Sequence, residues 1–226
     1  MEQTVVKKYD MKINIKKTKV MKLGRQPSII KITVGREILQ QVEEFKYLGS
    51  ILSSSWYSEK DIRVRIGMAK SAYNKLKKLL IGGLKLEVKK ILVKTLVWSV
   101  AMYGSETWTI KKVDATRQAF EMWVWRRLVK VKWTDKKTNA EVLNLVKEKK
   151  SLLSEMRKRK RKWIGHILRH ENMLHTVLEG RMKRKHPRWK KIIELVDDVM
   201  NGTYAQMKRR AEDREEWRRN VMRDLP

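Results

Sequence analysis

The strongest candidate for chemistry in this sequence is an unbroken run of six cations, Arg-Lys-Arg-Lys-Arg-Lys, at residues 157–162. The surrounding segment 157–191 holds fourteen Arg or Lys against two acids, a local net charge of +12. Consecutive side chains of a helix point in different directions, so these six can neither all form salt bridges nor all lie on one solvated face. A phosphate backbone would relieve their repulsion and release its counterions. The segment therefore predicts a polyanion-binding surface.

Two tryptophans, Trp163 and Trp189, flank the start and the end of this cationic segment. Their rings would suit stacking on unpaired bases. They would also suit packing in a core beneath a solvated basic face, and for the tryptophans taken alone we favour core packing.

Other residues with ligating or catalytic potential are sparse. His166 and His170 stand four apart, on one side of a helix, with His175 beyond, and two such imidazoles can share a metal. The neighbouring Arg and Lys would repel a cation, so we favour surface or packing roles and expect no metal site. The acids Asp197 and Asp198 lie in a helical pattern, which favours an exposed helix end over a two-metal clamp. The sequence contains no nucleophile triad and no glycine-rich phosphate loop.

The whole chain is strongly basic. Its 226 residues include 55 Lys or Arg and 25 Asp or Glu, a formal net charge of +30. Such self-repulsion points to a polyanionic partner, with nucleic acid first and an anionic membrane surface second. Hydrophobic residues make up 42%, including nine Trp, which predicts a folded protein rather than a basic tail.

Several classes of protein are excluded by composition. The absence of Cys rules out disulfides, cysteine-ligated zinc, iron–sulfur clusters and thiol catalysis. No apolar stretch approaches the roughly 20 residues of a membrane span. The segment 1–7 lacks the apolar core of a secretory signal, so we expect an intracellular protein, in the nucleus or the cytoplasm.

Hydrophobic periodicity divides the chain into a β-rich start and a helical remainder. Within residues 11–58 we expect a hairpin at Gly35 and a short aromatic strand ended by Gly49. From residue 59 apolar residues recur every three or four positions, which predicts helices. Capping-box patterns at Thr138 and Thr203 mark two helix starts. The expected helices cover about 59–80, 86–103, 114–131, 138 onward, 151–169, 189–200 and 203–222.

The predicted fold class is α+β and mostly α. A small N-terminal antiparallel sheet should occupy residues 1–58, a helical bundle 59–148 and a basic helical region 149–226. A shift in composition near Lys149 marks the last boundary.

Several segments together, in this order, resemble the reverse transcriptases of non-LTR (LINE-type) retrotransposons. The first two are similar to the end of the palm domain, and the later ones to the thumb and the C-terminal region. The resemblance is collinear and covers nearly the whole chain, and its specificity rests on this joint order. The segments are residues 12–21, 45–50, 61–66, 103–109, 125–128, 133–135, 165–169 and 211–218.

The resemblance assigns roles to parts of this chain. Lys17, Thr18 and Lys19 match the palm motif that follows the catalytic turn, and residues 45–49 are similar to the primer grip, a hairpin that holds the primer's 3′ end. The helices after Glu59 would form the thumb, which contacts the duplex backbone. The family's aromatic-X-Asp-Asp turn and its earlier metal-binding Asp would lie upstream of Met1.

We therefore expect a C-terminal part of such an enzyme, which binds a template–primer of RNA, DNA or hybrid and has no polymerase activity by itself. We expect no cofactor, and Mg²⁺ would be bound only if an upstream palm is supplied. The expected partners are nucleic acid and the rest of the reverse transcriptase. Three alternatives stay open: part of an active RNA-directed DNA polymerase, a basic membrane-surface protein, and the unselected product of a decayed element. The expected nucleic-acid contacts are Lys17, Lys19, Tyr47, Leu48, Gly49, Arg157, Lys158, Arg159, Lys160, Arg161, Lys162 and Trp163.

Overall fold

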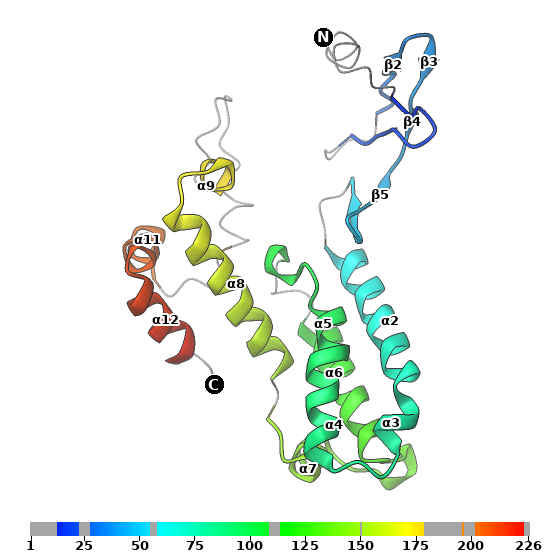
Figure 1. Cartoon of the computed structure of the whole chain (residues 1–226), viewed down its shortest axis with the longest axis vertical. Coiled ribbons are helices and arrows are strands. Elements are labelled where there is room, and N and C mark those ends of the chain that lie inside the picture. The colour runs from blue at the N-terminus through cyan, green and yellow to red at the C-terminus, as the bar shows by residue number, and fades with distance from the viewer. Residues whose placement is uncertain are drawn as a thin grey trace. The chain divides into compact units, whose positions relative to one another are not determined.

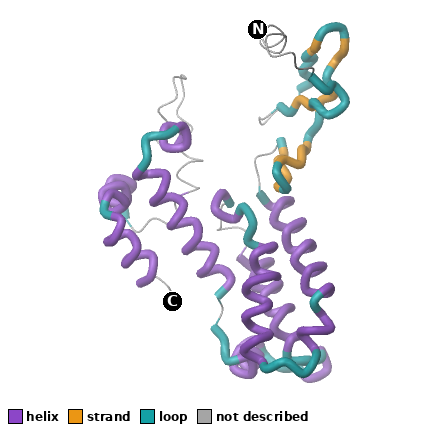
Figure 2. Tube along the Cα trace, in the orientation of Figure 1, coloured by secondary structure: helices purple, strands orange, loops and turns teal. Residues whose placement is uncertain are grey.

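The computed structural model of the chain describes residues 13–22, 28–54, 58–108, 114–149, 151–178, 196 and 202–223. Short strands near the N-terminus precede a series of helices, which confirms the α+β, mostly α fold class (Figure 2). The chain forms two compact units that divide between Val64 and Arg65, within helix α2. The domain boundaries expected at residues 58 and 148 stay predictions. The helix expected over 189–200, with Trp189, Asp197 and Asp198, falls on residues of which only Val196 is described.

The described strands of the first unit pair two by two, whereas we expected one antiparallel sheet. Two pairs, β2 with β3 and β5 with β6, are antiparallel, and β1 pairs with β4 in parallel. The hairpin expected at Gly35 is confirmed, because Gly35 turns β2 into β3 at a φ of 64°. The bounds are β1 Lys19–Val20, β2 Thr33–Val34, β3 Glu37–Ile38, β4 Gln40–Gln41, β5 Glu44–Tyr47 and β6 Ser50–Ser53.

The second unit is helical (Figure 1). It contains most of the buried apolar side chains among the described residues. The single helix expected over 59–80 is interrupted at Leu76, and Gly82 follows its last residue, as expected. The bounds are α2 Glu59–Lys75, α3 Lys77–Ile81, α4 Leu86–Leu92, α5 Trp98–Ala101, α6 Asp114–Leu128, α7 Asn139–Val146, α8 Leu152–Arg169, α9 Met173–Leu178, α11 Tyr204–Glu212 and α12 Arg214–Arg223, with short turns η1 Val93–Val97, η2 Ser105–Thr107 and η3 Trp133–Asp135.

Helix α4 continues through the π-helical turn η1 into α5, which matches the helix expected over 86–103. We expected this helix to be apolar on most sides and central in the core. Its inner side is buried, with Val93 and Val97 at 0% exposure, but Ile91 and Leu96 on the other side are exposed. The helix is therefore apolar on both sides, as expected, but only its inner side is buried, so it lies at the edge of the core and not at its centre.

The helix expected over 203–222 is in fact two helices, α11 and α12. The Thr203 capping box opens α11 as predicted, with Gln206 N donating to Thr203 Oγ1. Asp213 then ends α11, and its Oδ1 accepts hydrogen bonds from Glu215 N and Glu216 N at 2.8 and 3.0 Å. Because a carboxylate that accepts from these first amides starts a new helix, Asp213 breaks the expected helix in two.

Aromatic side chains join the helices around α6. Tyr73 of α2 lies edge-on to Trp123, with ring centroids 5.3 Å apart, and Trp98 of α5 packs in the same way on Trp125 at 5.7 Å. Edge-to-face pairs of this kind add to the free energy of burial. Helix α6 is thus the centre of one core.

A second cluster of buried residues joins α8 to α11 and α12. It contains Ile164, Ile167, Leu168, Leu178, Val196, Met207, Ala211 and Trp217. Gly165 of α8 allows this packing, because a Cβ at that position would overlap the indole ring of Trp217, with Nε1 as the nearest atom. The same Nε1 donates to the carbonyl oxygen of Arg161 at 3.0 Å. The absence of a side chain at Gly165 therefore positions α12 against α8.

We predict that Gly165→Ala destabilises the protein by about 1–3 kcal/mol, since the new methyl group displaces the Trp217 ring. Chemical denaturation measures the free energy of unfolding. Gly67→Ala is the matched control, because Gly67 lies inside α2 and an added methyl group would meet no atom within 4 Å. That control should gain up to about 1 kcal/mol from helix propensity. An equal gain for Gly165→Ala would contradict the packing described.

Candidate nucleic-acid interface

The run of six cations lies on α8, a helix whose start is held by a buried carboxylate. Glu121 of α6 is 2% exposed. Its Oε1 accepts hydrogen bonds from the backbone N–H groups of Ser151 at 2.9 Å and Leu152 at 3.3 Å. A negative charge at a helix N-terminus satisfies otherwise unpaired N–H groups and interacts favourably with the helix dipole. Glu121 thus fixes where α8 begins relative to α6.

One cation of the run points into the protein. Buried residues recur along α8 at every fourth position, Leu152, Met156, Lys160 and Ile164, so Lys160 belongs to the inner stripe. Its side chain is 0% exposed, and Nζ donates to the carbonyl oxygen of Trp108 at 2.7 Å. A buried ammonium needs such partners, since desolvation without them is costly. The expectation that Lys160 contacts nucleic acid is therefore wrong, because its charge is used inside the fold.

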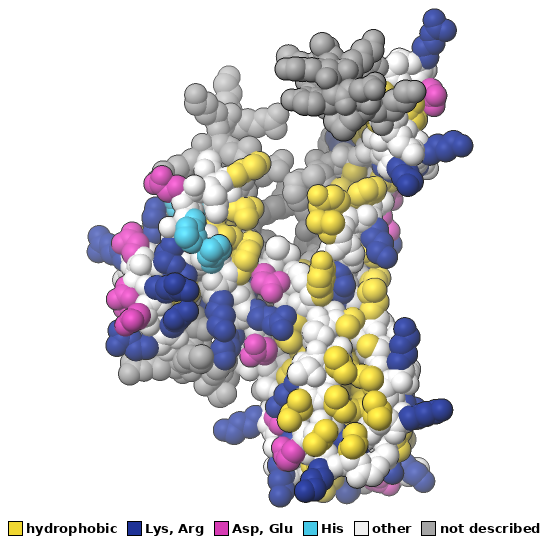
Figure 3. Space-filling view, viewed as in Figure 1, with side chains coloured by type: hydrophobic (Ala, Val, Ile, Leu, Met, Phe, Trp, Pro, Cys, Tyr) yellow, Lys and Arg dark blue, Asp and Glu magenta, His cyan; other side chains and the backbone are white. Residues whose placement is uncertain are grey.

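The other five cations surround this stripe on the outer side of α8. Lys162 is exposed, and the remaining four are half-buried. In Figure 3, Lys and Arg side chains gather beside the histidines over this part of the second unit. The five are Arg157, Lys158, Arg159, Arg161 and Lys162. We call these five residues together the α8 basic face.

Trp163 follows this face and is half-buried. It packs against the cluster that joins α8 to α11 and α12. This contact supports the interpretation of Trp163 as a core residue. Its stacking on a base stays a prediction.

The palm-like residues lie in the first unit. Lys17 is exposed in a turn, where its backbone N–H donates to Asn14 Oδ1 at 3.1 Å. Lys19 lies on β1, and its ammonium donates to the Gln40 side chain on the paired strand β4. Lys17 thus presents its charge to solvent, while that of Lys19 is engaged by a neutral partner.

The segment expected to resemble a primer grip is a hairpin, made of β5 and β6. Leu48 and Gly49 turn it with φ angles of 47° and 84°, a backbone that glycine adopts readily. At its tip, Tyr47 is 57% and Leu48 76% exposed. Asp61 of α2 holds the hairpin, because its Oδ1 accepts from Ile51 N at 2.9 Å. The tip is accessible, and its contact with a primer stays a prediction.

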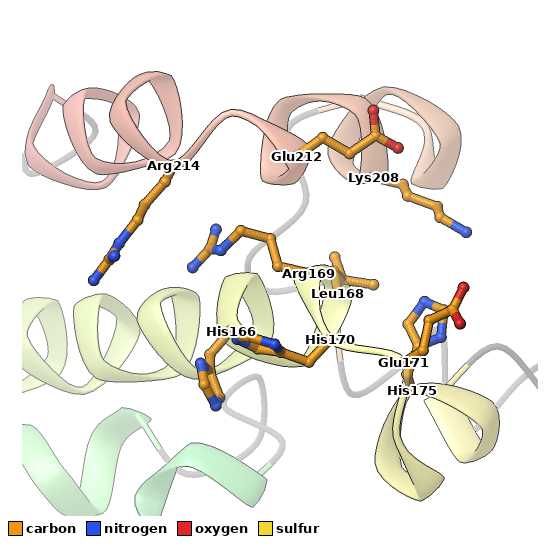
Figure 4. A pocket seen from close by; sticks show the side chains of 9 residues that line it. All are labelled: His166, Leu168, Arg169, His170, Glu171, His175, Lys208, Glu212 and Arg214. Atoms are coloured by element: carbon orange, nitrogen blue, oxygen red, sulfur yellow. The ribbon is translucent and has the colours of Figure 1, made fainter.

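The histidines lie by a pocket of about 760 Å³ at the C-terminal end of α8 (Figure 4). The rings of His166 and His170 have centroids 4.5 Å apart. Among the described residues, no three His, Asp or Glu side chains are arranged to hold a metal ion. The pocket is lined by His166, Leu168, Arg169, His170, Glu171, His175, Lys208, Glu212 and Arg214.

Arg169 is the anchored cation of this pocket. Its Nη1 donates to the carbonyl oxygen of Ala211 at 2.9 Å. Burial and the neighbouring guanidinium groups of Arg214 and Arg218 lower the pKa of Arg169. An arginine stays protonated at neutral pH despite such a shift, so positive charge accumulates at this end of α8 as well.

The structure thus brings together five of the sequence-predicted contacts on the α8 basic face and three at the hairpin tip. Sequence reasoning missed Glu121, which needs a tertiary contact to be found. It also missed the inner position of Lys160, although the spacing of Leu152, Met156 and Ile164 marks that position. None of the helices in the described part is both long and apolar enough to cross a bilayer.

Comparisons with known proteins give one informative match. The chain is 27% identical over 180 residues to an uncharacterized transposon-derived protein of Caenorhabditis elegans, in an alignment that covers 74% of this chain and 63% of that protein. The match therefore spans less than two thirds of the relative. No protein-family model matches the chain, and no solved structure does. The similarity points to a transposon origin.

We predict that Lys160→Ala lowers the free energy of unfolding by about 2–4 kcal/mol, because it removes the hydrogen bond to the Trp108 carbonyl oxygen and opens a cavity. Lys162→Ala, on the same helix but exposed, should change it by less than about 0.5 kcal/mol. Thermal and urea unfolding compare the two variants. Equal effects would show that Lys160 is not buried as described.

Proposed function

We propose that this chain binds the sugar–phosphate backbone of a template–primer, as the thumb and C-terminal part of a non-LTR retrotransposon reverse transcriptase. The observation that carries the proposal is the α8 basic face, five cations on a helix held to the core by Glu121 and Lys160. Adjacent cations on such a helix repel one another, and a phosphate backbone relieves that repulsion. The similarity to a transposon-derived protein supports the retrotransposon part of the proposal.

The binding should be weakly dependent on sequence. Arg and Lys side chains that reach phosphate oxygens position a nucleic acid without distinguishing its bases. The exposed hairpin tip, with Tyr47 and Leu48, is the second contact that we propose, at the primer end. Lys17 would add a phosphate contact from its exposed turn.

We further propose that binding needs no cofactor and that this chain does not polymerise alone. Polymerases hold two Mg²⁺ ions with carboxylates, and residues 1–226 contain no aromatic-X-Asp-Asp motif that would supply them. A primer-extension assay with Mg²⁺ should give no incorporation, whereas incorporation would show that the chain is catalytic.

We predict that replacing Arg157, Lys158, Arg159, Arg161 and Lys162 by Gln weakens template–primer binding at least about tenfold at 100 mM salt. The slope of log K against log salt should become less negative by about 2–4, since each lost phosphate contact changes the slope by about one. Fluorescence anisotropy with a labelled RNA–DNA template–primer measures both. Lys160 is retained so that the variant folds.

The control replaces the same number of charges elsewhere on the second unit. Lys75, Lys77, Lys78, Lys85 and Lys147 are all exposed, and their replacement by Gln should change the slope much less. Equal losses in both variants would show that net charge alone drives binding and would contradict a local interface. Anionic vesicles that displace the template–primer at equal charge concentration would favour a membrane surface instead.

A further inference from the structure

The tryptophan with the largest exposure among the described residues is neither of those that flank the cationic segment. Trp133 is 95% exposed, although tryptophan is highly buried on average in folded proteins. It begins the short turn η3, in the connection between α6 and α7. An exposed indole of this size has no packing role, so its position needs another explanation.

The connection that carries Trp133 is held by hydrogen bonds on both sides. Asp135 Oδ2 accepts from Lys132 N at 2.8 Å, and Lys136 N donates to the carbonyl oxygen of Trp133 at 3.3 Å. Arg126 of α6 reaches across, and its Nη2 donates to the carbonyl oxygen of Lys137 at 2.8 Å. These contacts fix the backbone under the ring, so that the indole is presented by a preorganised loop.

Both ends of this loop are also fixed. Val131 N donates to the carbonyl oxygen of Arg126 at 2.9 Å after the end of α6, and the Thr138 capping box starts α7. Lys130 and Lys136 adopt left-handed backbone with φ angles of 58° and 46°. Such conformations are uncommon for lysine, and here they are maintained by the surrounding hydrogen bonds.

The loop is cationic as well as aromatic. Residues 129–138 contain four lysines and one acid, Asp135, a net charge of +3. The carboxylate of Asp135 is already used by the backbone of Lys132. The four lysines are exposed, and they are Lys130, Lys132, Lys136 and Lys137.

We propose that Trp133 is a stacking platform for an unpaired base of single-stranded nucleic acid, with the surrounding lysines on the adjacent phosphates. A flat aromatic face amid cations fits a base and its backbone together, and every base has such a face. A duplex keeps its bases stacked on one another, so the loop should favour single strands. This inference extends the proposed function, which concerns backbone contact by α8, and names the unpaired template as the ligand of a second site.

The test compares single-stranded and duplex binding for three variants. Trp133→Ala should weaken binding of a labelled single-stranded 12-mer by about 5- to 100-fold, the range of one stacked base, and change blunt-duplex binding less than about twofold. Trp133→Phe should recover most of the loss, because it retains an aromatic face. Ile91→Ala is the control for removing an exposed apolar side chain, with 60% exposure, and should change neither affinity.

Fluorescence gives an independent readout on the same proteins. Stacking should quench the fluorescence of Trp133. The single strand should therefore quench the wild type more than Trp133→Phe, whereas the duplex should quench both proteins equally. Thermal unfolding should be unchanged in Trp133→Ala, since the ring is outside the core.

The outcomes separate this site from the α8 basic face. If Trp133→Ala loses its preference for single-stranded over duplex nucleic acid, the result supports the platform. Normal binding by the five-Gln variant of α8 would overturn only the proposed function. Unchanged single-strand affinity in Trp133→Ala overturns the platform. If that variant instead abolished self-association seen by sedimentation, Trp133 would belong to a protein contact and the platform would likewise be overturned.

Discussion

A helix that carries six cations in succession cannot pack on a core without burying at least one of them, and α8 meets this constraint with Lys160. The ammonium enters the protein and donates to the Trp108 carbonyl, while Glu121 accepts from the first amides of the helix. These two contacts set the rotation of α8 and its start. With the rotation set, the other five cations lie outside the buried stripe, Lys162 exposed and the remaining four half-buried.

The same helix organises two groups of neighbours. Its first part contacts α6 and η2, and its later part packs on α11 and α12, where Gly165 admits the Trp217 ring. The close approach at Gly165 restricts how α12 can shift along α8. Both proposed contacts lie on the second unit: α8 with the nucleic-acid backbone, and Trp133 with an unpaired base. The aromatic core around α6 belongs to the same unit.

Much of the helical part could be predicted from the sequence, because its signals are local. The capping boxes at Thr138 and Thr203 start helices where expected, and α8 has the predicted extent within one residue. The break at Asp213 has a local signal too, an acid placed to cap the residues after it, but the apolar spacing across it favoured one long helix.

What could not be predicted depends on contacts between distant segments. The roles of Glu121 and Trp108 at α8 join residues 30 or more positions apart, and nothing in their immediate sequence marks them. Among the described strands of the first unit, the two antiparallel pairs are local hairpins, whereas the parallel pair of β1 with β4 joins residues 21 positions apart and was not expected. The exposure of Trp133 was missed because composition and spacing suggest that tryptophans lie in a core.

The structure places Lys160 of α8 inside the protein, and we propose that the other cations of the run contact a nucleic-acid backbone. Amine-specific labelling followed by mass spectrometry tests it directly, with and without a template–primer. We expect Lys162 and Lys158 to react in the free protein and to become protected on binding, while Lys160 reacts in neither state. Reaction of Lys160 in the free protein, or equal labelling of Lys158 and Lys162 with and without the template–primer, would contradict it.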